Sequence, residues 1–548
     1  MTFLTVLRPK VSTENSTTST LLGGATFTGI AENVVDYATI TVFVYTNVSG
    51  SLSIQFSIDG TNWDHQQVQA ISAGVQAEFS VEVIAKYFRL VYTNGGTNQT
   101  VLRLTSLLNP YKSSSDAIVN AITNNGVALA PTLLDAFGRV KVSNPETLME
   151  HKFLTNKIPL RWDELVTGTS TATIELQIAY LNLKVGANTD RVVRQSRLYA
   201  PYQPGKALQI FVTGTLELSG GVSGVRSRIG YFDDATDKTQ EVASQQYGNG
   251  YFFELDGTTL YVVERSFTSG ILPVPSPKQT DNRVAQSSWN IDKMDGTGPS
   301  GITIDISKRQ IFYIELEWLG VGSVLMGLIV NRQLYFVHAF YHANIGNAYP
   351  YMCRPTLPVR YEIAKTSAAV GSGTLVQVCS TVLSDGGFVP VGLIFSAVRA
   401  TDLTISTTEK PLISMRLKSA TKRTIARLLS YNLLTDSGGQ IIYKIYRIVP
   451  PNGAVLSGVL TWLSVNPDSA VEYNENATGF STAGTNYEVL QTGFASTQSR
   501  GAPQGIDDRF AFVLSSDIAG NSDIIVITAY TYTGNVKVSA SIDWQEVE

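Results

Sequence analysis

Five carboxylates near the middle of this 548-residue chain have the residue type for acid–base chemistry. A glycoside hydrolase needs two Asp or Glu side chains across a cleft, one to protonate the leaving group and one to act as base or nucleophile. The candidates are Glu254, Asp256, Glu264, Glu315 and Glu317. Strand alternation alone produces such pairs, and no G-x-S-x-G, H-E-x-x-H or P-loop motif is present. We therefore expect no catalytic residue and no enzymatic activity.

Two histidines and two acidic segments are the candidate metal ligands. His338 and His342 would share a helical face and could then hold zinc, but the run around them is strand-like and lacks a Glu or Cys at zinc spacing. Hydrogen-bonded structural histidines are the simpler expectation. The oxygens of segment 233–237, or of Asp292 and Asp295, suit calcium but lack EF-hand spacing. Solvated turns explain both segments without a metal. The alternative for Asp292 and Asp295 is that they cap the Gly-rich turn by accepting backbone N–H bonds.

Aromatic side chains are the candidate contacts for a glycan or a protein partner. Exposed Tyr and Trp stack on sugar rings and also anchor protein interfaces. Those in or beside predicted loops, together with one Trp after a turn, are Trp63, Tyr199, Tyr202, Tyr247, Tyr251, Tyr349 and Tyr351. Interface packing is favoured over glycan binding, and Trp63 could equally plug the edge of a core. Arg194, Arg197, Arg226 and Arg228 are expected to bridge loops or subunits through carboxylate pairs.

The elements that must position these residues are strands. In residues 1–110, Leu52, Ile54, Phe56 and Ile58 alternate with polar residues, the period of two of a half-buried strand. Regularly spaced strands with turn signals predict a β-sandwich, jelly-roll-like, in this first module. Residues 111–132 break the pattern and predict a linker with a short helix that starts near Asp116 and stops at Asn124.

Two more modules follow. The middle module, residues 133–395, fits one large β-sandwich, and Asn331-Arg332 between two apolar runs predicts a tight hairpin. Its other expected strands include 172–183, 207–218 and 251–263. The last module, residues 396–548, predicts another sandwich, closed by a hairpin of strands 524–532 and 536–544; segment 424–434 could be strand or helix. The predicted fold class is all-β, with several antiparallel β-sandwich domains in series and one short linker helix.

Short motifs follow one another through the middle module, from a Gly-punctuated turn to a Gly-rich loop. They are LDAFGRVKVS (134–143), VRQ (193–195), YQPGK (202–206), WNIDKMDGTG (289–298), EWLGVG (317–322) and LPVRYEI (357–363). In this order they resemble a family of virion structural proteins of tailed bacteriophages, met in tail, baseplate or fibre parts and sometimes on capsid surfaces. The resemblance implies a building block of the virion, with a capsid-surface protein or a host-glycan receptor-recognition protein as alternatives.

Composition agrees with a part that associates with copies of itself. Only 16% of residues are charged, and low charge leaves little electrostatic resistance to association. The expected partners are other copies, in a trimer or ring, other virion proteins, and a host cell-surface glycan if the alternative holds. A net charge of −4 gives no basic footprint for nucleic acid, and no apolar run reaches membrane-span length.

The cysteine content and the N-terminal residues bear on the cellular compartment of the protein. Two cysteines, Cys353 and Cys379, are too few for a disulfide framework. Buried thiols in a protein assembled in a reducing host cytoplasm are the expected reading. No cofactor is expected, no signal peptide is visible at the N-terminus, and the expected location is the virion.

Overall fold

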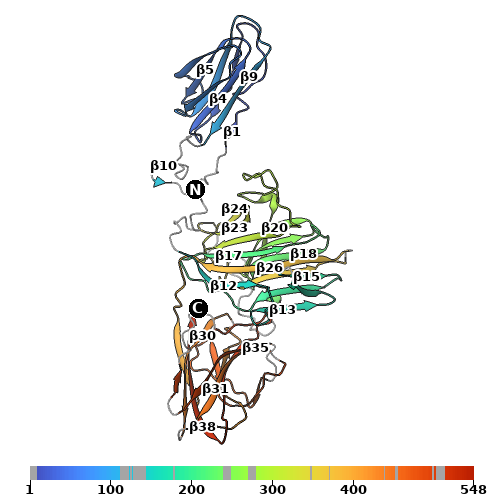
Figure 1. Cartoon of the computed structure of the whole chain (residues 1–548), viewed down its shortest axis with the longest axis vertical. Coiled ribbons are helices and arrows are strands. Elements are labelled where there is room, and N and C mark those ends of the chain that lie inside the picture. The colour runs from blue at the N-terminus through green and yellow to red at the C-terminus, as the bar shows by residue number, and fades with distance from the viewer. Residues whose placement is uncertain are drawn as a thin grey trace. The chain divides into compact units, whose positions relative to one another are not determined.

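The computed structural model describes residues 9–110, 122–123, 126–127, 144–176, 179–237, 248–268, 279–345, 349–368, 371–421, 423–436, 439–450, 455–484, 486–496, 499–501 and 512–547. They fall into two compact units, Met1–Ala130 and Pro131–Glu548, whose strands are labelled in Figure 1. Almost every regular element is an antiparallel strand; the helices described in full are two 3-10 turns, Ala235–Asp237 and Gln286–Ser288. The predicted all-β class is confirmed.

The N-terminal unit is a sandwich of two antiparallel sheets. One sheet has the spatial order β1 (Lys10–Val11), β9 (Leu102–Asn109), β4 (Thr39–Thr46) and β7 (Ala77–Glu82). The other has the order β2 (Thr26–Thr28), β8 (Tyr87–Asn94), β5 (Gly50–Ser57) and β6 (His65–Ile71), with β3 (Glu32–Asn33) beside β8. The period of two predicted for β5 is confirmed for Leu52, Ile54 and Phe56, which are buried between the sheets, whereas Ile58 lies past the end of β5 and is exposed.

The middle part of the second unit packs an eight-stranded sheet against a seven-stranded one. The eight-stranded sheet has the order β14 (Thr171–Glu175), β15 (Tyr180–Val185), β26 (Gly373–Ser384), β17 (Leu208–Thr215), β22 (Gln310–Leu316), β23 (Val324–Val330) and β24 (Gln333–Phe340), with β12 (Glu146–Lys152) also on β26. The seven-stranded sheet has the order β13 (Trp162–Thr167), β16 (Arg191–Ser196), β25 (Val359–Lys365), β18 (Val225–Phe232), β19 (Gly250–Asp256), β20 (Thr259–Ser266) and β21 (Thr280–Ala285).

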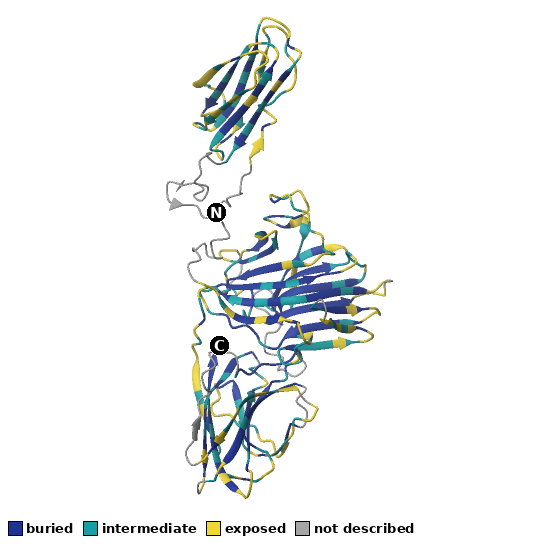
Figure 2. Cartoon of the chain, viewed as in Figure 1, coloured by how far each residue is buried: buried dark blue, intermediate teal, exposed yellow. Residues whose placement is uncertain are grey.

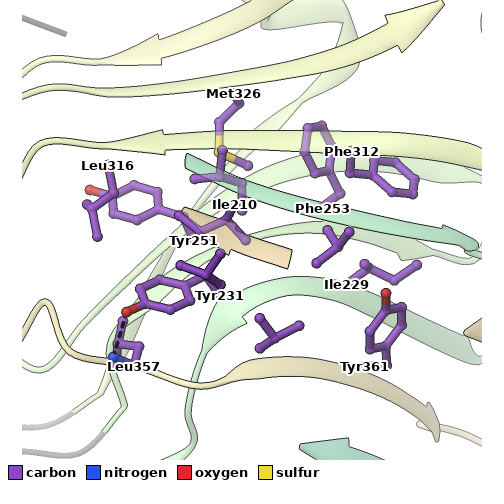
Figure 3. Packing of buried hydrophobic residues seen from close by; sticks show 14 of the residues in the cluster. Ile210, Ile229, Tyr231, Tyr251, Phe253, Phe312, Leu316, Met326, Leu357 and Tyr361 are labelled. Atoms are coloured by element: carbon purple, nitrogen blue, oxygen red, sulfur yellow. Dashed lines mark hydrogen bonds between the residues drawn. The ribbon is translucent and has the colours of Figure 1, made fainter. Parts of the chain in front are cut away.

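Large apolar side chains from both sheets fill the space between them, as Figure 3 shows. Phe253 of β19 meets Phe312 of β22 with ring centroids 4.8 Å apart. Tyr361 of β25 reaches across the core, and its hydroxyl lies 3.1 Å from the carbonyl of Thr213 in the opposite sheet. Buried Tyr hydroxyls need a partner, so these bonds fix how the two sheets face each other.

The C-terminal part of the second unit is another sandwich. One sheet has the order β27 (Leu393–Val398), β38 (Val536–Val547), β30 (Ile425–Thr435) and β36 (Ser499–Gly501), with β28 (Leu403–Ile405) also on β38. The other has the order β33 (Val471–Asn474), β29 (Lys410–Leu417), β37 (Ile524–Tyr530), β31 (Ile441–Val449) and β35 (Asn486–Ala495). A small pair, β32 (Leu456–Gly458) and β34 (Ala477–Phe480), completes the strands. The ambiguous segment 424–434 is thus a strand.

Three expected elements differ in detail. Expected strands 172–183 and 251–263 are each two strands of a hairpin, β14–β15 and β19–β20, and Gly257 supplies a positive φ of 60° in the second turn. The expected closing hairpin is wrong, because β37 pairs with β29 and β31 whereas β38 belongs to the opposite sheet. The turn at Thr533 to Asn535 therefore crosses between sheets.

The expected linker helix lies outside the described residues, apart from a two-stranded pair, β10 (Ile122–Thr123) and β11 (Gly126–Val127). There, Ile122, expected at the end of that helix, is extended. Within the described ranges no helix combines the length and apolar character that crossing a bilayer requires.

Candidate functional site

Three of the predicted aromatic residues meet two of the predicted carboxylates in the middle sandwich. Tyr251 of β19 donates a hydrogen bond to Glu264 of β20 at 2.9 Å. Tyr351, in the chain segment before β25, stacks on His342, just after β24, with centroids 3.7 Å apart and an interplanar angle of 11°. Tyr202 and Glu317 lie close enough to Tyr351 to affect its pKa, and Tyr202 donates a hydrogen bond to Glu317 at 3.0 Å. We call Tyr202, Tyr251, Glu264, Glu317, His342 and Tyr351 the Tyr–His–Glu cluster.

His342 is the most constrained member of this cluster. Its Nε2 lies 2.7 Å from a carboxylate oxygen of Glu264, and its Nδ1 lies 2.6 Å from the carbonyl oxygen of Gly322. Both ring nitrogens thus lie within hydrogen-bond distance of an oxygen from another part of the chain. The ring therefore ties three loops and strands together.

The tyrosines of the cluster are held in their neutral form. Burial, followed by the charge of Glu317, raises the pKa of Tyr202, and burial with the charge of Glu264 raises the pKa of Tyr251 and Tyr351. The Tyr202 oxygen also accepts the backbone N–H of Trp318 at 3.2 Å. The hydroxyl of Tyr202 therefore links its own loop to Glu317 and Trp318, and the hydroxyl of Tyr251 links β19 to β20.

The cluster is closed to large ligands. Tyr202, Tyr251 and Tyr351 are buried, and the side chains of His342 and Glu264 are only 13% and 14% exposed. The arrangement is therefore suited to holding the loops at this end of the sandwich, and its rings do not offer a face on which a sugar could stack.

The other predicted aromatic positions are scattered. Tyr199 is buried, accepts a hydrogen bond from Gln195 and lies under Arg423, whose guanidinium is 5.3 Å from the ring centroid. Tyr349 is half-buried, and Tyr247 lies outside the described residues. Trp63 is half-buried in the N-terminal unit, and Arg89 stacks on its ring at 4.1 Å from the centroid. Of this set, Trp63 and Tyr349 keep an exposed part.

The remaining predicted carboxylates belong to ion pairs or bonds inside the fold. Glu254 is fully buried and accepts from Arg228 at 2.7 Å and Arg283 at 2.6 Å. Asp256 pairs with Arg283 at 2.7 Å. Glu315 is buried and accepts from the hydroxyl of Tyr313 at 2.7 Å. These pairs do not face each other across an open groove in the described residues.

A ladder of buried charges, which sequence reasoning missed, covers the outer face of the seven-stranded sheet. Arg228, Glu254, Arg360 and Glu362 alternate with core residues along β18, β19 and β25, so they point away from the core. Arg228 stands directly opposite Glu254 on β19 and Glu362 on β25. The signal was present in the sequence as charges at every second position, of opposite sign on strands that pair. The partners could not be assigned without the strand order.

The other arginines singled out in the sequence also pair with carboxylates. Arg194 pairs with Glu164 at 3.1 Å, and Arg197 pairs with Asp163 at 3.1 Å. Arg226 lies 3.9 Å from Glu254. All of these pairs lie within one chain.

The solvated turn expected at 233–237 is wrong, because Asp234 and Asp237 are buried and pair with Arg265 at 2.9 Å and Arg360 at 2.6 Å. The other candidate metal ligands have ordinary hydrogen-bonding roles. Asp292 is buried and accepts the backbone N–H groups of Met294 at 2.9 Å and Ser300 at 2.7 Å. Asp295 accepts the N–H of Thr297 at 2.9 Å. Both carboxylates therefore stabilise the Gly-rich loop by accepting backbone N–H bonds, as the alternative expectation for Asp292 and Asp295 predicted. His338 accepts the N–H of Asn290 at 3.2 Å, and burial lowers its pKa to about 4. Its partners differ from those of His342.

Strand β27 shows an unusual surface. Among the described strands it pairs with β38 alone, so its other edge has no strand neighbour there. Outward-facing residues of a sandwich strand are ordinarily polar, yet Ile394 and Val398 are 65% and 62% exposed. The segment just before it exposes Val389 and Val391 as well, and Figure 2 colours most of the strand as exposed. Residues 389–398 contain no charged side chain.

One family model matches the first part of the chain. Residues 5–109 match the family described as the uncharacterised protein YqxG N-terminal domain. No curated protein matches the chain. The matched residues lie within the N-terminal unit.

Solved structures share low sequence identity with the chain. The PBSX exported protein XepA is 13% identical, over 70% of this chain and 88% of its own, with a TM-score of 0.18. A legume lectin-like domain from Entamoeba histolytica is 9% identical, over 44% of this chain and 97% of its own, with a TM-score of 0.26. A protein of unknown function from Shewanella oneidensis MR-1 is 9% identical, over 48% and 98%, with a TM-score of 0.28.

Proposed function

We propose that this chain is a non-enzymatic structural protein of a bacteriophage virion, which associates with copies of itself in the tail, baseplate or fibre. The sequence resemblance over residues 130 to 390 supports the virion assignment. Residues of the motifs in this stretch form hydrogen bonds with one another. Tyr202 bonds to Glu317 and Trp318, and Arg360 donates to Gln195 at 2.9 Å. Motifs whose residues bind each other fit a scaffold better than a reaction centre.

The observation that carries self-association is the exposed, charge-free segment 389–398 with strand β27. An unprotected strand edge is a template for pairing with another chain, and natural proteins ordinarily protect such an edge with charge, proline or a covering loop. Pro390 is the one such device within this segment, and it precedes the strand. A second copy meets no like-charge repulsion here. Trimers or rings follow if the contact is heterologous and closes.

Light scattering coupled to gel filtration tests this on the full chain. The wild type should elute as an oligomer, and Leu393→Lys with Ile394→Lys should give monomers, because both side chains are more than half exposed and charge opposes burial. Ile58→Lys, at a residue that is 80% exposed in the N-terminal unit, is the matched control and should leave the oligomer intact. A monomeric wild type would overturn the proposal.

Salt separates apolar from charge-mediated association. Exposed ion pairs contribute about 0–1 kcal/mol each, and about 1 M salt shortens the screening length to roughly 3 Å. The oligomer should therefore survive in about 1 M NaCl. Dissociation under those conditions would point to charged contacts.

Mass spectrometry of purified virions tests the proposed location, since a chain that is absent from the particles is not a part of the virion.

A glycan-binding role is the second candidate, and Trp63 with the stacked Arg89 is the observation that favours it. A half-buried ring with a guanidinium on one face leaves an aromatic edge beside a donor group. Glycan-array binding that is lost in Trp63→Ala and kept in Trp63→Phe would support it. The alternative capsid-surface position is tested by mass spectrometry of capsids and tails separated from purified virions.

A further inference from the structure

A cavity of about 350 Å³ lies where the middle and C-terminal sandwiches of the second unit meet. Its lining comes from both sandwiches: β12 with His151, the loop with Arg161, Arg197, and from the other side Arg447 of β31 with Ser515. Hydrogen bonds join the two sandwiches beside it, since Arg197 donates to the carbonyl of Pro450 at 2.9 Å and Arg447 to that of Leu160 at 3.0 Å. The volume is in the range of small-molecule pockets, roughly 300–1,000 Å³.

Two of its arginines are buried and incompletely bonded. The side chains of Arg197 and Arg447 are 4% and 3% exposed. Arg197 uses Nε and Nη2, and Arg447 uses Nη2, whereas Nη1 of Arg197 and Nε of Arg447 have no hydrogen-bond partner within the described residues. A buried donor without an acceptor is costly, and both of these arginines belong to the residues that line the cavity.

The surrounding carboxylates do not fill that role. Asp163 pairs with Arg197 through Nη2 at 3.1 Å, and Glu488 lies 3.3 Å from Nη2 of Arg447. Asp523 is buried near both arginines, and burial raises its pKa and that of Asp163. Glu150, the one acidic residue of the lining, is 67% exposed and lies 3.8 Å from Lys152.

His151 adds a neutral polar group to the lining. Burial, followed by the charges of Arg161 and Arg194, lowers its pKa to about 3, so the ring is uncharged at neutral pH. Its Nδ1 is buried and has no hydrogen-bond partner in the described part of the chain. Together with the hydroxyl of Ser515, it suits a ligand that carries hydroxyl groups next to its negative charge.

We propose that this cavity is a binding site for the oxyanion of a small hydroxylated ligand, a carboxylate or a phosphate. Arg161, Arg197 and Arg447 receive the charged oxygens, because guanidinium groups match the planar or tetrahedral array of oxyanion acceptors. His151 and Ser515 contact the neutral hydroxyls. The two sources of this chemistry are an acidic sugar unit and a phosphate group. The site does not depend on whether the chain belongs to a virion.

Calorimetric titration of the full chain tests the site, with sodium glucuronate, inorganic phosphate and uncharged glucose as three separate probes in about 0.15 M NaCl. Saturable binding of glucuronate alone identifies an acidic-sugar site, and binding of phosphate identifies a phosphate site. Glucose should give no saturable heat. Absence of saturation with both anions up to about 50 mM, a ceiling equivalent to less than 2 kcal/mol of binding free energy, would overturn the proposal and leave water as the only occupant.

Matched charge-removing variants locate the binding. Arg161→Gln takes a half-buried lining charge away and should weaken the anion roughly tenfold to a hundredfold, the range expected for a charge-assisted bond. Arg332→Gln, exposed in the β23–β24 turn, makes the same charge change outside the cavity and should bind as the wild type does. Equal loss in both variants would refute the site as non-specific attraction. A thermal unfolding scan of each variant confirms that it is folded.

Discussion

Replacing Glu362 by Gln should destabilise the middle sandwich by about 3–5 kcal/mol, the range for removing one partner of a buried ion pair. Glu362 is 2% exposed and accepts hydrogen bonds from three arginines. Arg191 Nε lies at 3.2 Å, Arg228 Nη1 at 3.3 Å, and Arg360 Nε and Nη2 at 3.0 and 2.7 Å. A Gln amide offers one oxygen and turns an NH2 group toward these cations, which leaves buried positive charge uncompensated.

Differential scanning calorimetry measures the effect. A domain of about 150–250 residues loses roughly 2–4 °C of Tm per kcal/mol, so the transition of the middle sandwich should fall by roughly 6–20 °C. The control is Glu472→Gln, whose partner Arg416 lies at 2.6 Å but is 36% exposed. An exposed pair contributes about 0–1 kcal/mol, so the control should shift the Tm by a few degrees at most.

The same variant gives a pH dependence. Burial raises the pKa of Glu362, but the charges of Arg360, Arg191 and Arg228 outweigh it and hold that pKa well below the ordinary value of 4.5. A carboxyl with a depressed pKa in the folded state contributes its full stability above the unfolded pKa and loses it as the pH falls toward the folded value. The Tm difference between wild type and Glu362→Gln should therefore be largest near pH 7 and narrow below about pH 4.5. Equal Tm values for Glu362→Gln and Glu472→Gln, or a difference that does not narrow, would refute the reasoning.

Three further outcomes are expected. Arg332→Gly should stabilise the chain by up to about 1 kcal/mol in urea unfolding, because Arg332 has a positive φ of 68° in a two-residue hairpin where Gly is favoured; a loss of stability would show that the side chain does more than occupy the turn. Asp292→Ala should cost about 1–3 kcal/mol in the same assay, since two buried N–H groups lose their acceptor, and Asp305→Ala, in an exposed turn, should cost less. Burial raises the pKa of Cys353 to about 11, so its native thiol should react with a thiol reagent at about pH 8 roughly a hundredfold more slowly than free cysteine; a rate like that of free cysteine would contradict the burial.

Local patterns predicted the strands well where one face is wet. The hairpin at Asn331-Arg332 is confirmed, with φ values of 51° and 68° at the two residues, and the alternation of Leu52, Ile54 and Phe56 is confirmed in β5. In both cases the information lies within a few residues, in a turn and a period of two. The predicted strand boundary fails where a turn is itself apolar or short, as between β19 and β20.

Pairing between distant segments was not predictable in this way. β37 and β38 are adjacent in sequence and separated by a turn signal, which is the pattern of a hairpin. Only the burial of both strands in opposite sheets makes the turn a crossing. The burial of the tyrosines expected in or beside loops was missed for the same reason. Tyr251 was expected beside a loop, but packing against the opposite sheet, which local sequence does not reveal, buries it.

The motif LDAFGRVKVS (134–143) lies outside the described residues, whereas the later motifs that carry the resemblance include residues that make contacts within the middle sandwich. Tyr202 joins Glu317, Arg360 joins Gln195, and Asp292 braces its own loop. Such residues are constrained by folding, so a likeness in them reports a shared scaffold more than a shared ligand. What distinguishes one protein on this scaffold from another must then lie outside the motifs. In this chain the exposed segment 389–398 and the arginine-lined cavity both meet that condition, and the two can be tested independently because no residue is common to them.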